Sequence, residues 1–224
     1  MPRMGTLHLV RHGQASFGSD DYDRLSELGA RQCQRLGEYF RQRDVRFAGV
    51  ITGTLRRHRE SLAALLRGLQ VEHDALAMPG LNEYDSEAIV HAIHPQPLKR
   101  ASNPEEVRQH FRLLRDGLVA WIEGRTKPDG MPSFAQFSAG IVEALDLVRT
   151  RHDGDVLIVS SGGPISTAVA HVLDAPPKSM IELNLRMRNS ALTEFAFTPK
   201  RHSLVTFNTL PHLEGVDASW VTHT

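Results

Sequence analysis

The sequence predicts an α/β fold with three layers, α/β/α, in which helices cover both faces of a mostly parallel central sheet. Three short apolar segments rich in β-branched residues are each followed by a helical pattern. This alternation is typical of parallel strands joined by right-handed helical crossovers. The three strand and helix pairs are residues 6–10 with 25–43, residues 47–53 with 55–69, and residues 154–162 with 165–173.

The rest of the chain completes this architecture. Residues 104–124 and 134–152 carry strong helical patterns, so we expect a helical insertion over about residues 81–151. Residues 190–210 contain two β-rich runs, which predict a C-terminal β-hairpin at the edge of the sheet. We therefore expect a single domain over residues 1–224, and Ser26 is placed to cap the helix after the first strand.

The composition limits the partners of the protein. Lys and Arg number 26, as do Asp and Glu, so net charge gives no reason to expect a nucleic acid or an anionic membrane. Cys33 is the only cysteine, which excludes an internal disulfide and makes a zinc site built on cysteine unexpected. The N-terminal residues resemble neither a signal peptide nor a membrane span, so the expected location is the cytoplasm.

Polar residues with the chemistry of a phosphoryl site follow each apolar segment. Ligands of an open parallel sheet bind beyond the carboxyl ends of its strands. The residues at those positions are Arg11 with His12, the range 52–57, and the range 160–163. The planar guanidinium of arginine and the backbone N–H groups at a helix N-terminus bind phosphoryl oxygens well. A neutral imidazole beside that group is able to attack phosphorus.

Five segments resemble, in order, the motifs of one known family, the histidine phosphatase superfamily. That family includes cofactor-dependent phosphoglycerate mutases and many small phosphatases. Together the segments span nearly the whole chain, and they lie on the expected strand ends and helix starts. They are "LVRHGQA" from Leu9, "LSELGARQ" from Leu25, "GTLRRHRES" from Gly53, "LNEYD" from Leu81 and "VLIVSSGGPI" from Val156.

The resemblance implies roles for the basic residues of the first and third segments. His12 matches the nucleophile that forms a phosphohistidine, and Arg11 matches the arginine that binds the transferring phosphoryl group. The second arginine motif of the family reads leucine, any residue, arginine. With Leu55 as its leucine, Arg57 is the match and Arg56 is only its neighbour.

The resemblance also implies a proton donor. Glu83 matches the acid that protonates the leaving oxygen and later activates water in many phosphatases of the family. The residues after Glu83 depart from the family pattern, so Asp85 and Glu87 remain alternative acids. The first loop lacks the asparagine and arginine that often bind phosphate in the mutases, and Ser16 is expected to supply part of that hydrogen bonding.

The largest departure from the family lies at residues 160–163. The family usually has Ser-His-Gly-Gly there, and this chain has Ser-Ser-Gly-Gly. Ser161 and Gly162 are expected to contact the phosphoryl group, but Ser161 brings no charge. Loss of one preorganised donor costs roughly 3–4 kcal/mol, which predicts reduced activity. His58 directly follows Arg57 and would point about 100° away around a helix, so we do not expect it to replace the missing histidine.

These features favour a metal-independent phosphomonoesterase that needs no cofactor and acts on a small phosphorylated substrate. The alternative is a catalytically weak module that binds phosphoesters or inorganic phosphate, and a phosphoglycerate mutase is less favoured. His91 and His94 have no clear third ligand, so no metal is expected. A serine hydrolase built on Ser161 ranks last, because Val159 stands where a Gly-x-Ser-x-Gly turn requires glycine.

Overall fold

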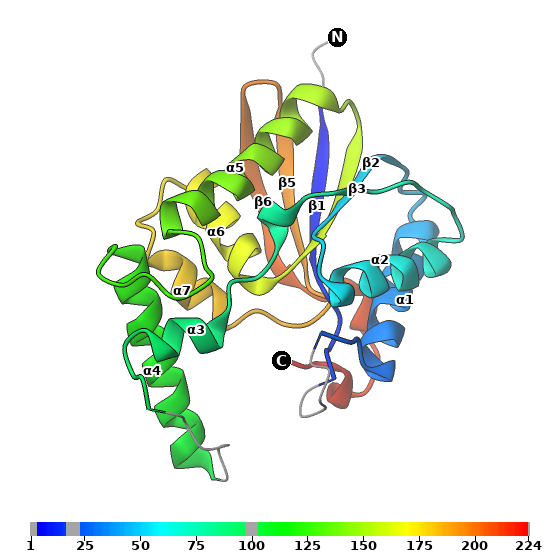
Figure 1. Cartoon of the computed structure of the whole chain (residues 1–224). Helices are drawn as coiled ribbons and strands as arrows, with labels where there is room; N and C mark the ends of the chain where they lie inside the picture. Colours follow the sequence, from blue (N-terminus) through cyan, green and yellow to red (C-terminus); the bar gives the residue numbers. More distant parts are fainter. Residues whose placement is uncertain (1–3, 17–22, 97–102, 224) are drawn as a thin grey trace.

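The computed structural model describes residues 4–16, 23–96 and 103–223 (Figure 1). Its centre is a six-stranded sheet with the strand order β3-β2-β4-β1-β5-β6. The first four strands in this order are parallel, and the last two form an antiparallel hairpin at one edge. The predicted α/β fold, with its mostly parallel sheet and C-terminal hairpin, is confirmed. The strands are β1 (Gly5–Arg11), β2 (Phe47–Thr52), β3 (Leu76–Ala77), β4 (Asp155–Ser160), β5 (Leu192–Thr198) and β6 (Arg201–Thr209).

The central strands are apolar because both of their faces are buried. In β4, Val156 and Ile158 pack into the core on one side of the sheet, whereas Leu157 and Val159 pack into the core on the other side. Successive side chains of a strand point to opposite faces, so a continuous apolar run fills both layers. This packing explains why β4 reads as an unbroken apolar segment.

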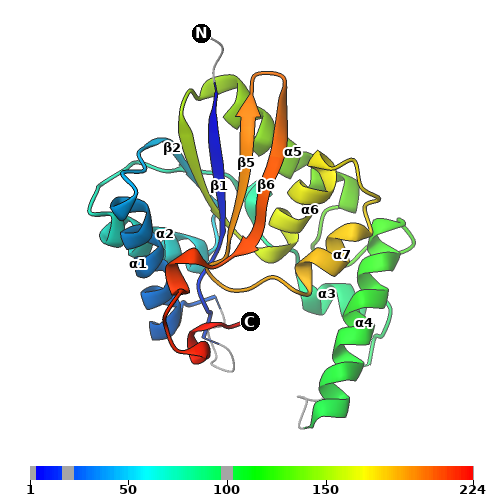
Figure 2. The ribbon, with the colours of Figure 1, turned by 180° about the vertical axis from the view of Figure 1, so that it is seen from behind.

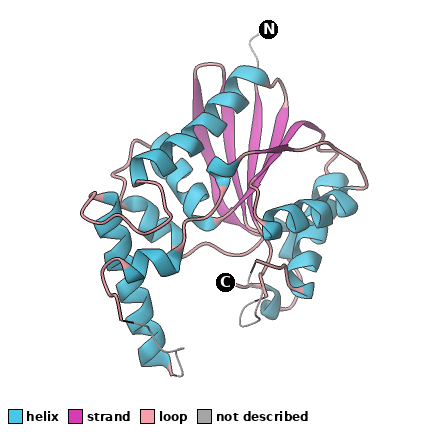
Figure 3. Cartoon of the chain, viewed as in Figure 1, coloured by secondary structure: helices cyan, strands magenta, loops and turns pink. Residues whose placement is uncertain are grey.

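Two groups of helices cover the sheet (Figures 2 and 3). On one face, α1 (Glu27–Gln42) packs on α2 (Arg56–Leu69). On the other face, α5 (Phe134–Arg151) lies beside α6 (Gly162–Val172). Five residues of α5 belong to the same core as Leu9 of β1, namely Phe137, Ile141, Ala144, Leu145 and Val148.

Shorter elements and one long helix gather near the carboxyl ends of the parallel strands. They are α3 (Ser86–His91), α4 (Pro104–Ile122) and α7 (Ser179–Asn184), and α4 extends away from the sheet (Figure 1). The 3-10 helices are η1 (Pro79–Leu81), η2 (Pro211–Leu213) and η3 (Ala218–Trp220). No helix within the described ranges is long and apolar enough to span a membrane.

Candidate active site

The loops that follow β1, β2 and β4 meet at one edge of the sheet. The backbone N–H of His12 donates to the carbonyl of Ser160 at 2.9 Å, and the N–H of Gly53 donates to the carbonyl of Val159 at 3.1 Å. Because β4 lies between β1 and β2, these two bonds join all three loops. The polar residues singled out in the sequence at these strand ends are therefore neighbours in space.

His12 lies at the centre of this edge and is almost fully buried, with 2% of its surface exposed. Its Nδ1 lies 2.7 Å from the carbonyl oxygen of Gly13. A carbonyl oxygen only accepts, so Nδ1 carries the proton and Nε2 keeps its lone pair. Burial lowers the pKa of His12 well below its usual value, and the charges of Arg11 and Arg57 lower it further. The ring is thus a neutral imidazole whose free nitrogen is Nε2.

Close packing against α1 holds the loop that carries His12. A Cβ atom on Gly13 would lie 2.3 Å from the carbonyl oxygen of Gly29, and one on Gly29 would lie 2.2 Å from that of Gln14. Both positions therefore require glycine. The predicted helix cap is confirmed, because the hydroxyl of Ser26 accepts the N–H of Gly29 at 3.0 Å. The start of α1 thus lies directly against the loop of His12.

Arg11 is held by main-chain carbonyls from two distant segments. Its Nη1 donates to the carbonyl of Met187 at 2.5 Å and to that of His223 at 3.2 Å. Its charge lowers the pKa of both His12 and Glu83, as expected of a guanidinium that shares their site. Arg11 therefore brings a permanent positive charge close enough to act on the ring of His12.

The C-terminal segment reaches the site because polar side chains bind it. Nε2 of Gln32, on α1, donates to the carbonyl of Trp220 at 2.7 Å and to Oγ1 of Thr222 at 3.0 Å. The hydroxyl of Thr222 donates to Oδ1 of Asn189 at 2.9 Å. These bonds place the carbonyl of His223 next to Arg11.

Arg57 supplies a second buried cation, whereas its neighbour Arg56 points to solvent. The side chain of Arg57 is 10% exposed, and its charge acts on His12 and Glu83. Nε of Arg56 instead lies 2.7 Å from Oε1 of Glu60 on the helix surface. The geometry thus places Arg57 at the site, as the sequence pattern indicated.

Asp23 is a site residue that the sequence did not reveal. Its Oδ1 lies 2.8 Å from Nη1 of Arg57, and its Oδ2 accepts the N–H of Arg56 at 2.8 Å. Asp23 therefore caps α2 as well as pairing with Arg57. No local signal predicts this role, since the residue directly before α2 is Leu55, which makes no side-chain cap.

Glu83 is a second carboxylic acid at the site, and it lies against the start of α6. Its Oε2 accepts the N–H of Gly163 at 3.1 Å, and its Oε1 accepts the N–H of Tyr84 at 3.2 Å. Removal of the Glu83 carboxyl group from water raises its pKa, and the Gly163 amide and the charges of Arg57 and Arg11 partly offset this effect. Asp85 caps α3 through the N–H groups of Glu87 and Ala88 and is exposed.

Ser161 and His58 form a buried pair that contradicts the expectation from helix geometry. Nε2 of His58 lies 2.6 Å from Oγ of Ser161, and both residues have no exposed surface. Helix geometry predicts that His58 points about 100° away from Arg57. His58 nevertheless reaches Ser161, because α2 begins at Arg56 and a group beyond the start of a helix is reached from several sides of its first turn.

Gly162 begins α6 beside Asn184, another residue that sequence patterns did not single out. A Cβ atom on Gly162 would lie 2.2 Å from Oδ1 of Asn184. Nδ2 of Asn184 donates to the hydroxyl of Tyr84 at 2.7 Å. The backbone N–H of Ser16 donates to the carbonyl of Arg24 at 2.8 Å, and residues 17–22 of this loop lie outside the described ranges.

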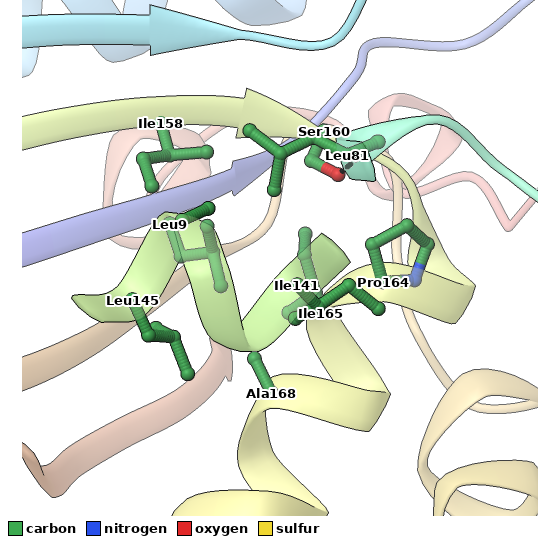
Figure 4. Close-up of a pocket in the computed structure, with 10 residues that line it drawn as sticks. Leu9, Leu81, Ile141, Leu145, Ile158, Ser160, Pro164, Ile165 and Ala168 are labelled. Carbon is green, nitrogen blue, oxygen red and sulfur yellow. Dashed lines mark hydrogen bonds between the residues drawn. The ribbon is translucent and has the colours of Figure 1, made fainter. Parts of the chain in front are cut away.

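A small cavity behind the site is apolar and belongs to the core (Figure 4). Its volume is about 10 Å³, which is room for no more than one water molecule. Ser160 turns its hydroxyl to the carbonyl of Leu81 at 2.7 Å. Within the described part of the chain, no group of three or more His, Cys, Asp or Glu side chains is placed to hold a metal ion.

The profile of the histidine phosphatase superfamily (branch 1) matches residues 7–210. The chain therefore belongs to the histidine phosphatase superfamily. No curated protein matches the sequence.

Several solved structures with a similar fold, at about 20% identity, are phosphatases. A phosphoserine phosphatase mutant from Entamoeba histolytica, in complex with phosphoserine, has a TM-score of 0.65 at 19% identity and covers 94% of this chain and 100% of its own. The α-ribazole phosphatase of Shigella flexneri has a TM-score of 0.62 at 20% identity, with coverage of 91% and 96%. A mycobacterial glucosyl-3-phosphoglycerate phosphatase has a TM-score of 0.62 at 21% identity, with coverage of 92% and 99%.

Proposed function

We propose that the protein is a metal-independent phosphomonoesterase that forms a phosphohistidine on His12 and acts on a small phosphorylated substrate. The observation that carries this proposal is the state of the His12 ring. Its Nδ1 proton is held by Gly13 at 2.7 Å, so the lone pair on Nε2 is available to attack phosphorus. A nucleophile at phosphorus also needs positive charge nearby, and Arg11 and Arg57 both act on this ring.

In the first step, Nε2 of His12 attacks phosphorus and forms the P–N bond while the P–O bond to the leaving group breaks. Arg11 and Arg57 hold the non-bridging oxygens and balance their charge. The leaving oxygen takes the proton of the Glu83 carboxylic acid. The raised pKa of Glu83 supports this role, because it keeps a larger share of the carboxyl protonated in the free site.

In the second step, water attacks the phosphohistidine. The Glu83 carboxylate takes one proton from this water, the new P–O bond forms, and the P–N bond to His12 breaks. Inorganic phosphate leaves and His12 returns to its neutral form. The hydrogen bond from Nδ1 to Gly13 is available throughout, and it stabilises the positive charge that the ring carries while it is phosphorylated.

The test is a panel of phosphomonoesters assayed with a chelator and no added metal. Wild type is expected to release phosphate and to form a phosphoenzyme that is labile in acid and stable in alkali. H12A should lose both turnover and label, and turnover that survives in H12A would overturn the proposal. R57A should lose activity, whereas the matched control R56A should keep it, because Arg56 pairs with Glu60 on the surface.

A catalytically weak module that binds phosphoesters or inorganic phosphate is the alternative. It is supported by Ser161, which replaces the histidine usual in the family with a group that carries no charge. Binding of phosphate by wild type, without turnover of any ester in the panel, would favour this module. A phosphoglycerate mutase is less favoured because the first loop lacks the phosphate-binding residues common in mutases. Ser16 and Gly162 are proposed as further phosphate ligands.

A further inference from the structure

His58 and Ser161 stand at the starts of two helices that follow neighbouring strands. His58 is the third residue of α2, which follows β2, and Ser161 directly precedes α6, which follows β4. Thr52 and Val159 are paired across these two strands. The hydrogen bond of 2.6 Å between Nε2 of His58 and Oγ of Ser161 therefore spans the carboxyl edge of the sheet.

The pair lies beside the proposed nucleophile. The ring centroids of His12 and His58 are 5.8 Å apart, and the ring planes are inclined by 37°. The backbone N–H of His12 donates to the carbonyl of Ser160, the residue directly before Ser161. His58 thus contacts both the ring of His12 and the hydroxyl of Ser161, and all three side chains are buried, so the pair lies against the proposed nucleophile and away from solvent.

The surroundings of His58 indicate which of its nitrogens carries the proton. Within the described ranges, Nδ1 of His58 is buried and has no hydrogen-bond partner. It faces Gly53, where a Cβ atom would lie 2.1 Å away. Burial lowers the pKa of His58 to about 3, so the ring is neutral and has one proton. A buried N–H without an acceptor is rarer than a bare acceptor, which places the proton on Nε2.

This tautomer sets the direction of the hydrogen bond. Nε2–H of His58 donates to Oγ of Ser161, which leaves the hydroxyl hydrogen of Ser161 free to donate elsewhere. We propose that His58 is a positioning residue that fixes Ser161 as a hydrogen-bond donor to the transferring phosphoryl group. This inference rests on the proposed phosphatase function. The family usually has a histidine at the position of Ser161. Here the imidazole of His58 would act on the phosphoryl group indirectly, through the hydroxyl of Ser161.

The opposite arrangement would make Ser161 a nucleophile with His58 as its base. That arrangement needs the proton on Nδ1 and a group that accepts it, as the acid does in a Ser-His-Asp triad. The described residues offer no such acceptor at Nδ1 of His58. The two arrangements leave different covalent labels, because phosphoserine survives acid whereas phosphohistidine does not.

The central experiment exchanges the two side chains. H58A is expected to lower kcat by about 100-fold with little change in KM, as loss of one preorganised donor does. S161H alone should not raise kcat, because the new ring would meet His58. The double variant H58A/S161H restores an imidazole beside His12, and its kcat should be at least tenfold higher than that of H58A. A purely structural pair would show no such recovery.

A second buried histidine and serine pair provides the matched control. Nε2 of His212 lies 2.9 Å from Oγ of Ser190, and burial lowers the pKa of His212 to about 3 as well. H212A should therefore lose stability much as H58A does but keep kcat. Thermal unfolding of both variants separates loss of fold from loss of a catalytic hydrogen bond. A kcat within twofold of wild type in folded H58A would overturn the inference.

Vanadate binding provides a readout that does not depend on turnover. Vanadate adopts the five-coordinate geometry of the transferring phosphoryl group, so H58A should bind it about 10- to 100-fold more weakly, and H58A/S161H should regain affinity. If H12A retained turnover while H58A still weakened vanadate binding and H58A/S161H restored it, the phosphohistidine mechanism would be rejected. The role of His58 in positioning Ser161 would stand. An acid-stable label that disappears in S161A would instead reject the assignment of Ser161 as a donor.

Discussion

Asp23 pairs with Arg57 through an Nη1 to Oδ1 distance of 2.8 Å, so the second cation of the site already has a carboxylate partner. The same carboxyl group caps α2 through the N–H of Arg56. A phosphoryl group that binds Arg57 must therefore share it with Asp23. This pairing sets the position of the guanidinium, and in the proposed site it would also set how strongly Arg57 binds an anion.

We expect D23N to bind inorganic phosphate more tightly. Asparagine keeps an oxygen that caps α2 but removes the charge that repels phosphate, so the inhibition constant should fall about three- to fivefold, in line with ~1 kcal/mol for a partly exposed ion pair. Product inhibition at constant pH measures this change. E60Q is the control, because Glu60 pairs with the exposed Arg56. Weaker phosphate binding by D23N would show that Asp23 mainly orients Arg57.

We expect E83Q to lose activity in a way that depends on the leaving group. Alkyl phosphates need a proton on the departing oxygen, so their kcat should fall by about 10²–10⁴. The phenolate of p-nitrophenyl phosphate leaves without a proton, so with this substrate the rate of the first step should fall less. The E83Q enzyme should then accumulate as the phosphoenzyme. D85N is the matched control, since Asp85 caps α3 and asparagine keeps that cap. Equal losses for both substrates without phosphoenzyme would contradict the assignment of Glu83.

The pH dependence of kcat/KM should report His12 and Glu83. His12 must be neutral to attack, and its lowered pKa moves the acid limb well below pH 6.5. Glu83 must be protonated in the first step, and its raised pKa moves the alkaline limb upward from the usual value of a carboxyl group. We therefore expect kcat/KM to fall on the alkaline side as Glu83 loses its proton, after correction for ionisation of the substrate. An alkaline limb that persists in E83Q would contradict this assignment.

Stability should fall as the pH falls below about 6.5. His12, His58 and His212 are neutral in the folded state because burial lowers their pKa values, with His58 and His212 at about 3. The unfolded chain binds protons at these positions near pH 6.5, so stability is complete above that pH and declines below it. Each histidine contributes a slope of about 1.4 kcal/mol per pH unit to the free energy of unfolding, and groups whose pKa is raised on folding reduce the total slope. Urea unfolding between about pH 7.5 and 4.5 measures this pH dependence, and the free energy of unfolding of H212Q should change less steeply with pH.

Short-range sequence patterns were enough to predict five of the six strands and the loops of the site, whereas the two-residue strand β3 is too short to give a pattern. The apolar runs that became β1, β2 and β4 placed Arg11, His12 and the range 160–163 at strand ends, and the structure brings these positions together. The choice of Arg57 over Arg56 followed from motif spacing and agrees with their burial. Local pattern succeeds in these cases because the position of a residue along one strand or one helix start decides where it lies.

The remaining contacts depend on where two distant segments meet, which no local pattern contains. Asp23 caps a helix that begins more than 30 residues later, as its bond to the N–H of Arg56 shows. His58 was misjudged because an angle around the helix axis does not describe a site that lies beyond the helix end. Asn184 reaches Tyr84 across 100 positions of sequence. Such residues become visible only when the layers are assembled.

The bonds that hold Arg11 also carry information about the order of folding. Its guanidinium contacts carbonyls that lie 176 and 212 positions away along the chain. Contacts of such long sequence separation are expected to form late, because closing the long loop between the two partners costs conformational entropy before the contact is gained. The part of the site that holds Arg11 is thus complete only when the segments that carry Met187 and His223 have docked. A partly folded chain would have its secondary structure before it had a competent pocket, so activity would return after helix content during refolding.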